Sequence, residues 1–368
     1  MMISGGLLSA ALLAVAAGAP ATMPHYDHIF VIIEENHTAD QIIGNPAAPN
    51  LTRLAKTFGY ASEFYAERHP SEPNYVAMLG GDTFGIRDDD AFYCKAQTKD
   101  WGCPHSGAAG YVDHTVTAPG LTSQLAAHHL TWKGYFEDIP TPGSRVYRWP
   151  VPGQPVPGKP AELYAVKHNG FMNFRDVQDD PAIVQKVVGF DILARDLASG
   201  NVANYVQIVP NQCDDMHGVK AAEAPADCAK KNAAALIGRG DSDAAKLVDE
   251  ITRSPVWSAP GNSAIVITFD ENDDDTPSGH PDGCCGSGLQ DKDNPGGGWI
   301  PTIVITNHGP RGAVDPTPYN HYSLLRTTED ALGIAEHLGH AADADKGVRD
   351  MTPLFAAGGG KGVPARTQ

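Results

Sequence analysis

Several features that mark common protein classes are absent from this sequence. There is no Cys-x-x-Cys spacing, which argues against a zinc site made of cysteines. Positive charge is scarce: 27 Lys and Arg oppose 44 Asp and Glu, and the formal net charge of −17 argues against nucleic acid binding through a basic surface. No internal repeat appears, and no change of composition marks a linker. We therefore expect the 368 residues to form one large domain.

The N-terminal segment lacks Lys and Arg, and its apolar run is too short to span a membrane comfortably. That run, from Leu7 to Ala19, has the length of the apolar core of a secretory signal. Ala19-Pro20-Ala21 then supplies small residues for cleavage before Thr22. We therefore predict a signal peptide over residues 1–21, a secreted or periplasmic protein, and no stable membrane span.

Six cysteines, an even number, fit an oxidising compartment. Cys94 with Cys103, and Cys213 with Cys228, bracket short loops and are candidate disulfide pairs. Cys284 and Cys285 are adjacent, and the sequence leaves their state open.

The chain is organised around an apolar run without alternation, Ile29 to Ile33, that breaks abruptly into polar residues. Such a run predicts a central strand buried on both faces, as in a parallel α/β sheet. Ligand sites of open α/β sheets lie at the carboxyl ends of the strands. Glu35 and Asn36 fall at that end and offer oxygen ligands suited to a divalent cation. The alternative is a polar cluster that caps the next helix.

The remaining elements are assigned by the same periodicity. The predicted strands are 131–136, 203–209, 264–269 and 300–306. The predicted helices are 48–60, 121–129, 191–198, 241–253 and one that begins near 319. Ser242 is a candidate cap for the helix over 241–253. The proline-rich stretch 139–160 is expected to be an ordered loop or lid, with a domain linker as the alternative.

A second motif is the segment from His69 to Tyr75. Ser71 followed by Glu72-Pro73 predicts the start of a helix, which Gly80-Gly81 ends. A hydroxyl at a helix N-terminus lies among free amide groups, which stabilise an alkoxide and hold a phosphate. The alternative is a serine that only caps the helix.

Three predicted strands end in acidic groups: Glu35-Asn36, Asp214-Asp215-x-His217 and Asp270-Glu271, and a fourth ends in Asn307-His308. Parallel strands bring such ends together, where carboxylates repel one another unless a cation lies among them. We therefore predict an oxygen-rich metal site near a serine, which fits metal-assisted phosphoryl transfer. The turn at Lys167-His168 adds a cation and an imidazole that suit contact with a phosphoryl oxygen or proton transfer. His105, Asp113 and His114 are weaker ligand candidates, in a loop from 82 to 120.

Five blocks in order resemble the phosphoesterase family of acid phosphatases and bacterial phospholipases C, within the alkaline phosphatase superfamily. They are Glu35-Asn36-His37-Thr38-Ala39-Asp40, His69 to Tyr75, Asn211-x-Cys213-x-Asp215-Met216-His217, Thr268-Phe269-Asp270-Glu271, and His321 to Asp330. The resemblance implies a three-layer α/β sandwich with a mostly parallel central sheet flanked by helices. It also implies a single phosphoesterase domain over 22–357, followed by a flexible tail over 358–368.

Carried over position by position, the resemblance implies one divalent metal, of undefined identity, bound by Glu35, Asn36, Ser71, Asp270 and Glu271. Ser71 is at the same time the expected nucleophile, and His168, Asp215 and His217 are expected around the phosphate and the leaving group. Thr38 and Ala39 depart from the family pattern, which has Ser and Phe there.

The function implied is a secreted, metal-dependent phosphomonoesterase of the acid phosphatase type, acting on a small phosphate ester through a phosphoserine. One alternative is a phosphodiesterase or phospholipase C on the same scaffold. A more remote alternative is a non-catalytic calcium-binding module that uses the loop 272–298. A sulfatase is not expected, because the signature Cys-x-Pro-x-Arg is absent. No oligomeric state is predicted.

Overall fold

The computed structural model describes residues 22–154, 156–220, 224–273, 279–287 and 296–356. Its centre is a nine-stranded mixed sheet in the order β10-β2-β9-β8-β1-β7-β3-β6, with β11 paired to β2. The strands are β1 (His28–Glu34), β2 (Gly59–Tyr65), β3 (Trp132–Phe136), β6 (Val187–Val188), β7 (Tyr205–Val209), β8 (Ser263–Phe269), β9 (Trp299–Thr306), β10 (Ala313–Asp315) and β11 (Tyr319–Asn320). A separate two-stranded sheet pairs β4 (Arg148–Trp149) with β5 (Tyr164–Ala165).

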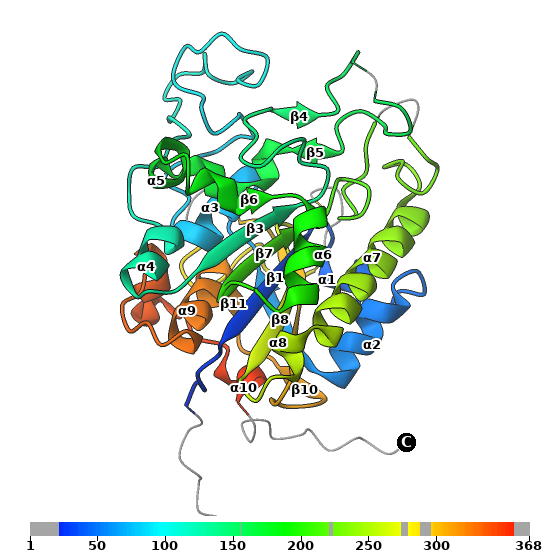
Figure 1. The fold of residues 1–368 in the computed structure, drawn as a ribbon, viewed down its shortest axis with the longest axis vertical. Coiled ribbons are helices and arrows are strands. Elements are labelled where there is room, and N and C mark those ends of the chain that lie inside the picture. Colours follow the sequence, from blue (N-terminus) through cyan, green and yellow to red (C-terminus); the bar gives the residue numbers. More distant parts are fainter. Residues whose placement is uncertain (1–21, 155, 221–223, 274–278, 288–295, 357–368) are drawn as a thin grey trace, which may run out of the picture.

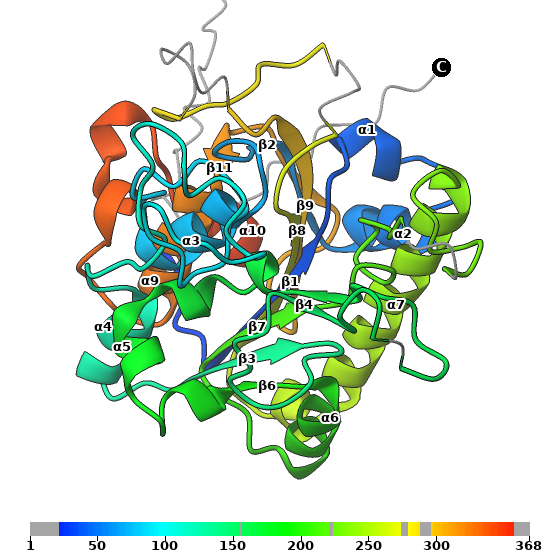
Figure 2. The same cartoon turned by 90° about the horizontal axis from the view of Figure 1, so that it is seen from above.

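Helices cover both faces of the central sheet (Figure 1). The helices are α1 (Ala39–Ile42), α2 (Pro49–Thr57), α3 (Glu72–Gly80), α4 (Leu121–Ala127), α5 (Arg175–Asp179), α6 (Phe190–Ser199), α7 (Ala233–Arg253), α8 (Pro255–Ser258), α9 (His321–Ala331) and α10 (Thr352–Phe355). In Figure 2, α3 and α9 lie on one side of the sheet, and α2 and α7 lie on the other. The predicted class, a three-layer α/β fold with a mostly parallel sheet, is confirmed.

The middle of the sheet is parallel, which brings three of the predicted strand ends together. β1 lies between β7 and β8 and is parallel to both, with Ile32 in register with Ile208 and with Ile267. Residues Ile29 to Ile33 are all buried, as the continuous apolar run predicts. The segments that follow β1, β7 and β8 therefore meet at one edge of the sheet.

The fourth strand end does not join them. β9 runs antiparallel to both β8 and β2. It therefore ends at the opposite edge, where the Asn307 amide donates to the carbonyl of Ser263, the first residue of β8. The expectation that Asn307 and His308 join the acidic cluster is wrong, because it assumed that β9 is parallel.

Two predicted helices have different bounds in the structure. The helix predicted over 48–60 ends at Thr57, and the chain from Gly59 onward pairs with β9 as β2. The helix predicted from residue 241 begins eight residues earlier, at Ala233. Ser242 therefore lies inside α7, where its hydroxyl bonds to the carbonyl of Gly238 instead of capping the helix.

Tertiary contacts stabilise the part of α7 that contains Gly238 and Gly240. The Asp241 carboxylate accepts hydrogen bonds from the backbone amides of Asn50 and Leu51 in α2. A Cβ at Gly240 would lie 2.3 Å from Cγ of Met216, so the absence of a side chain permits close packing.

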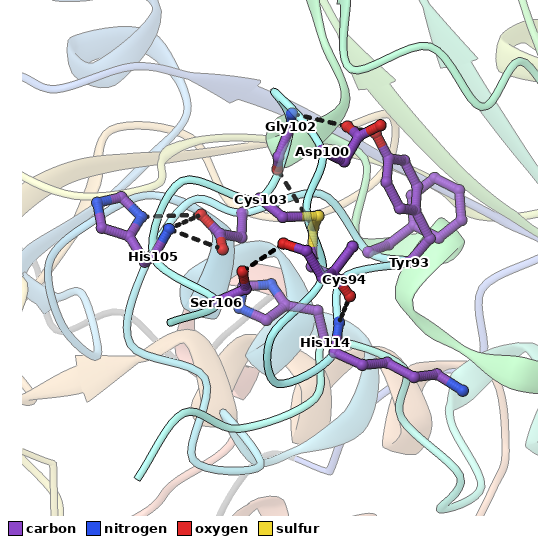
Figure 3. Close-up of a disulfide and its surroundings, with 12 residues drawn as sticks. Tyr93, Cys94, Asp100, Gly102, Cys103, His105, Ser106 and His114 are labelled. Atoms are coloured by element: carbon purple, nitrogen blue, oxygen red, sulfur yellow. Dashed lines mark hydrogen bonds and ion pairs between the residues drawn. A yellow bond between two sulfur atoms is a disulfide. The ribbon is translucent and has the colours of Figure 1, made fainter. Parts of the chain in front are cut away.

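Both predicted disulfides are present, and Cys284 is bonded to Cys285. Figure 3 shows the Cys94–Cys103 bridge, which ties together a loop that also carries His105 and His114. No described helix has the length and hydropathy needed to cross a membrane. The predicted signal peptide over 1–21 and the predicted tail over 358–368 lie outside the described residues, as do most acidic residues of the loop 272–298.

Candidate active site

Ser71 precedes α3 as predicted, but its side chain does not cap the helix. The buried hydroxyl instead lies 3.3 Å from Oε2 of Glu35 and 3.2 Å from Oε1 of Glu271, and it accepts a hydrogen bond of 3.2 Å from Nζ of Lys167. The interpretation of Ser71 as only a capping residue is therefore wrong. Its hydroxyl faces charged groups from three separate segments of the chain.

The local structure around α3 fixes this position. The Asn74 side chain accepts hydrogen bonds from the amides of Glu67 and Arg68 and donates to the Arg68 carbonyl, which holds the loop before Ser71 against the helix. At the other end, α3 stops at Gly81 as predicted, with φ of 70°. A Cβ on Gly81 would lie 2.2 Å from the Leu338 carbonyl oxygen, so only glycine fits this turn.

Four of the predicted metal ligands converge beside Ser71. The Asn36 backbone amide lies 3.2 Å from Oδ1 of Asp270, and the Asn36 side-chain amide donates to Oε1 of Glu271 at 2.9 Å. Asn36 adopts a φ of 47°, a left-handed conformation that asparagine tolerates better than most residues. His69 adds an ion-pair contact of 2.7 Å to Glu271.

The charges of this group are not balanced by the protein alone. Burial raises the pKa of Glu35 well above its usual range, and the Asp270 carboxylate raises it further. Burial and the neighbouring Glu271 raise the pKa of Asp270 to about 7. Among the described residues, Oδ1 of Asn36, Oδ2 of Asp215 and Oδ2 of Asp270 are buried without a hydrogen-bond partner. Unpartnered buried oxygens among repelling carboxylates are the donor set that suits a divalent cation.

His168, Asp215 and His217 lie on the other side of Glu35. Nε2 of His168 is 3.2 Å from Oε1 of Glu35, and its Nδ1 is 3.7 Å from Oδ2 of Asp215. The imidazole stacks on Tyr75, whose hydroxyl donates to Glu35 at 2.5 Å. The rings of His168 and His217 meet edge to face at 5.7 Å. All the predicted catalytic residues are thus brought together.

Both imidazoles are in environments that favour the neutral form. Burial lowers the pKa of His168 and of His217 well below the usual value, and the charge of Lys167 lowers both further. Nδ1 of His217 lies 2.7 Å from the Gly218 carbonyl and must donate to it, which leaves Nε2 of the neutral ring as an acceptor.

Lys167 lies closer to the centre of the site than the sequence indicated. Its ammonium group bridges Ser71 Oγ and Oδ2 of Asp89, at 3.2 and 3.0 Å. Although burial lowers its pKa, the carboxylates of Asp89 and Glu35 raise it above its usual value. Lys167 was visible as one half of the polar turn 167–168, whereas nothing in the loop 82–120 singled out Asp89.

Other candidates lie elsewhere. His105 contacts Asp90, and His114 is buried between Glu72 and Asp88. Asp214 turns away from Asp215 and pairs with Arg239 at 2.7 Å. The aspartate pair therefore contributes only Asp215 to the site.

The fold and this site define a three-layer α/β protein that holds a buried serine among carboxylates at the edge of its central sheet. Residues 45–335 match the phosphoesterase family, and the chain belongs to that family. It is a hydrolase that acts on phosphate ester bonds, and the predicted family membership is confirmed.

Two relatives illustrate the similarity. A phosphatidylinositol-3-phosphatase of Mycobacterium tuberculosis is 29% identical over 92% of this chain and 90% of its own length. A phosphate-repressible acid phosphatase of Penicillium chrysogenum is 25% identical over 78% of this chain and 56% of its own length.

The fold is also similar to that of solved structures. The PsFucS1 sulfatase from Pseudoalteromonas sp. matches with a TM-score of 0.53 at 11% identity, over 91% of this chain and 73% of the sulfatase. A protein in the alkaline phosphatase superfamily from Vibrio parahaemolyticus matches with a TM-score of 0.47 at 11% identity, over 86% of this chain and 68% of that protein. At these identities the likeness concerns the fold alone.

Proposed function

We propose that this protein is an exported, metal-dependent phosphomonoesterase in which Ser71 is the covalent nucleophile. The observation that carries the proposal is the position of the Ser71 hydroxyl. It stands at the start of a nine-residue helix, makes no capping bond, and is instead held between two carboxylates and the ammonium group of Lys167.

Glu35, Asn36, Asp270 and Glu271, together with Ser71, would hold one divalent cation. When bound, such an ion supplies positive charge that lowers the pKa of the serine hydroxyl and offsets charge on the phosphoryl oxygens. The donor set of three carboxylates, an amide and a hydroxyl is made of oxygens, which suits hard cations such as Mg²⁺, Ca²⁺ and Mn²⁺.

The chain's own residues perform the remaining steps of the proposal. Ser71 releases its hydroxyl proton to water, and its Oγ attacks phosphorus in line and forms a phosphoserine while the bond to the leaving alkoxide breaks. Lys167, whose ammonium group lies 3.2 Å from Ser71 Oγ, stabilises the negative charge there. His168 or His217 protonates the leaving alkoxide; an arriving phosphate dianion favours the protonated imidazole that this step requires. Water then hydrolyses the phosphoserine.

Both relatives described above are named as phosphatases, which supports the monoester reaction over the diester reaction. The phosphodiesterase or phospholipase C alternative uses the same nucleophile and differs in the second substituent on phosphorus. A purely calcium-binding module would leave the contacts of Ser71 without a role.

The test is hydrolysis of p-nitrophenyl phosphate and bis-p-nitrophenyl phosphate by the purified mature protein, with and without EDTA. The key variant is Ser71→Ala, and the matched control is Ser242→Ala, at an exposed position in the middle of α7. We expect cleavage of the monoester that EDTA abolishes, that Ser71→Ala loses by more than about 10³-fold, and that Ser242→Ala retains.

Preference for the diester would favour the phosphodiesterase reading. Activity retained by Ser71→Ala would overturn the nucleophile assignment. Export is tested separately, by determining the N-terminal residue of the protein recovered outside the cytoplasm, which we expect to be Thr22.

A further inference from the structure

A cavity of about 270 Å³ adjoins the candidate active site. Asn36 and His217 of that site belong to the residues that line it. Asn36 Nδ2 and Ser71 Oγ both lie within hydrogen-bond distance of the same atom, Oε1 of Glu271, at 2.9 and 3.2 Å. Asn36 thus connects the cavity lining to the Ser71 hydroxyl through Glu271, and His217 of the candidate site lines the same cavity.

Lys230 lines the same cavity and is exposed. Among the residues that the structure describes, its ammonium group has no hydrogen-bond or ion-pair partner. The other charged residue on the lining, Asp273, already accepts a hydrogen bond from the side-chain amide of Gln41 at 3.3 Å. Lys230 is thus the cation of the cavity that is available to a ligand.

The fold places the Lys230 backbone firmly beside His217. The Cys213–Cys228 disulfide ties the segment of Lys230 to the loop that follows β7. The amide of Val219 donates to the carbonyl of Cys228 at 3.0 Å. Gly218 has a φ of 73°, and a Cβ there would lie 3.0 Å from the Lys230 Cα, so the two segments touch.

The surroundings reinforce the positive charge. Lys220 and Lys231 line a neighbouring cavity together with Lys230. Three lysines close together stand out in a chain with a formal net charge of −17. A local cationic surface at the mouth of a site attracts an anion even when the protein as a whole repels it.

We propose that this cavity is a leaving-group subsite in which Lys230 binds a second anionic group of the substrate. The preferred substrates are then phosphomonoesters whose alcohol carries a further phosphate or a carboxylate. This inference rests on the proposed function, because the scissile phosphate must lie at Ser71 for its leaving group to enter the cavity.

The test uses two matched substrate pairs with the metal-loaded enzyme. Glycerol 3-phosphate and 3-phosphoglycerate differ by a carboxylate, and fructose 6-phosphate and fructose 1,6-bisphosphate differ by a phosphate. Within each pair we measure kcat/KM for the substrate with two anionic groups and divide it by kcat/KM for the substrate with one. The two pairs also distinguish a carboxylate from a phosphate as the preferred second group.

We expect Lys230→Met to lower this ratio about fivefold, mainly through KM, for the pair that the subsite prefers. Lys230→Arg should restore most of the ratio, because it restores the charge. The matched control is Lys231→Met, which removes the same charge one residue away but from outside the cavity, and should change the ratio less than twofold. Added salt should reduce the preference in the wild type.

An equal loss in Lys231→Met would show a general charge effect and overturn the subsite, as would an unchanged ratio in Lys230→Met. These outcomes leave the proposed function intact if the wild type still hydrolyses p-nitrophenyl phosphate. Absence of that hydrolysis would overturn the proposed function itself and the subsite with it.

Discussion

Two buried histidines of this protein each lie between a pair of carboxylates, yet the two environments shift the histidine pKa in opposite directions. His114 lies 2.9 Å from Glu72 and 3.0 Å from Asp88, in the loop region of Figure 3. Although burial lowers its pKa, the two carboxylates raise the pKa of His114 to about 10. His168 lies farther from its carboxylates, at 3.2 and 3.7 Å, and burial together with Lys167 lowers its pKa.

The difference separates a structural cluster from a candidate site. The His114 group is a charged imidazole paired with carboxylates on both sides, so its charges largely compensate one another. Around His168, Oδ2 of Asp215 has no hydrogen-bond partner among the described residues, and the carboxylates repel one another. A histidine among carboxylates therefore indicates a binding site when its imidazole does not compensate the charge of those carboxylates.

A second acidic group near His114 is likewise held by contacts within the protein. Asp88, Asp90 and His105 are close enough together to suggest a metal site. However, Asp90 accepts hydrogen bonds from the His105 amide, the His105 imidazole and the Tyr111 hydroxyl. The Asp90 carboxylate is satisfied by the protein, so we assign this cluster to holding the loop.

The largest expected effect comes from Asp270→Asn, which removes one carboxylate of the proposed metal set. We expect kcat/KM for p-nitrophenyl phosphate to fall by about 10³-fold or more. The rise in melting temperature that a divalent cation gives the wild type should also disappear. In EDTA the variant should be at least as stable as the wild type, because repulsion within the site is reduced. Asp249→Asn, on the exposed face of α7, is the control. A full metal-dependent shift in Asp270→Asn would refute the ligand assignment.

His114→Leu should instead destabilise the fold, because it leaves Glu72 and Asp88 as unpaired carboxylates. We expect a loss of about 3 kcal/mol in the free energy of unfolding, measured with urea in EDTA. His128→Leu, at an exposed histidine, should change it by less than about 0.5 kcal/mol. Equal effects of the two substitutions would remove the structural role of the His114 cluster.

Lys167→Met tests the cation of the candidate site around His168. We expect kcat to fall about 50-fold, because the charge that stabilises the Ser71 alkoxide is lost. This variant should still bind the metal, which is measured by the rise in melting temperature that the cation causes. Lys246→Met, at an exposed lysine, serves as the control. A change in KM alone would assign Lys167 to substrate binding and not to the chemical step.

The smallest expected effect concerns pH. Because the folded-state pKa of His114 is raised to about 10, its contribution to stability is complete below the unfolded value of 6.5 and is lost as pH rises through the folded value. The stability difference between the wild type and His114→Leu should therefore shrink by about 1 kcal/mol between pH 7 and pH 8. Using this difference cancels the titration of the active-site carboxylates. A difference that grows with pH would mean that His114 is neutral when folded.

The parts of the site that the sequence predicted depend on local patterns. The apolar run of β1 and the polar residues after it are contiguous, so Glu35 and Asn36 could be placed at a strand end. Ser71 and Gly81 follow helix start and stop preferences that act within a few residues. Local preferences therefore predicted the segment of the proposed nucleophile and the strand that precedes two of the proposed metal ligands.

The parts that were missed depend on long-range packing. The direction of β9 is not encoded in its own residues, and neither is the pairing of Gly59–Tyr65 with it. The contact between Asp89 and Lys167 joins residues 78 positions apart, through a loop whose course depends on a disulfide. Such contacts follow from the tertiary fold, so no short motif predicts them.

The direction of β1 has a practical consequence for handling the protein. The site lies at the carboxyl end of β1, whereas the chain enters β1 from the opposite edge of the sheet (Figure 1). There, the hydroxyl of Tyr26 donates to the carbonyl of Phe355 in α10 at 2.8 Å, which joins the two ends of the described chain. A purification tag, a fluorescent fusion or a tether to a solid support joined directly to residue 22 or to residue 356 would thus be attached on the side of the sheet away from the site.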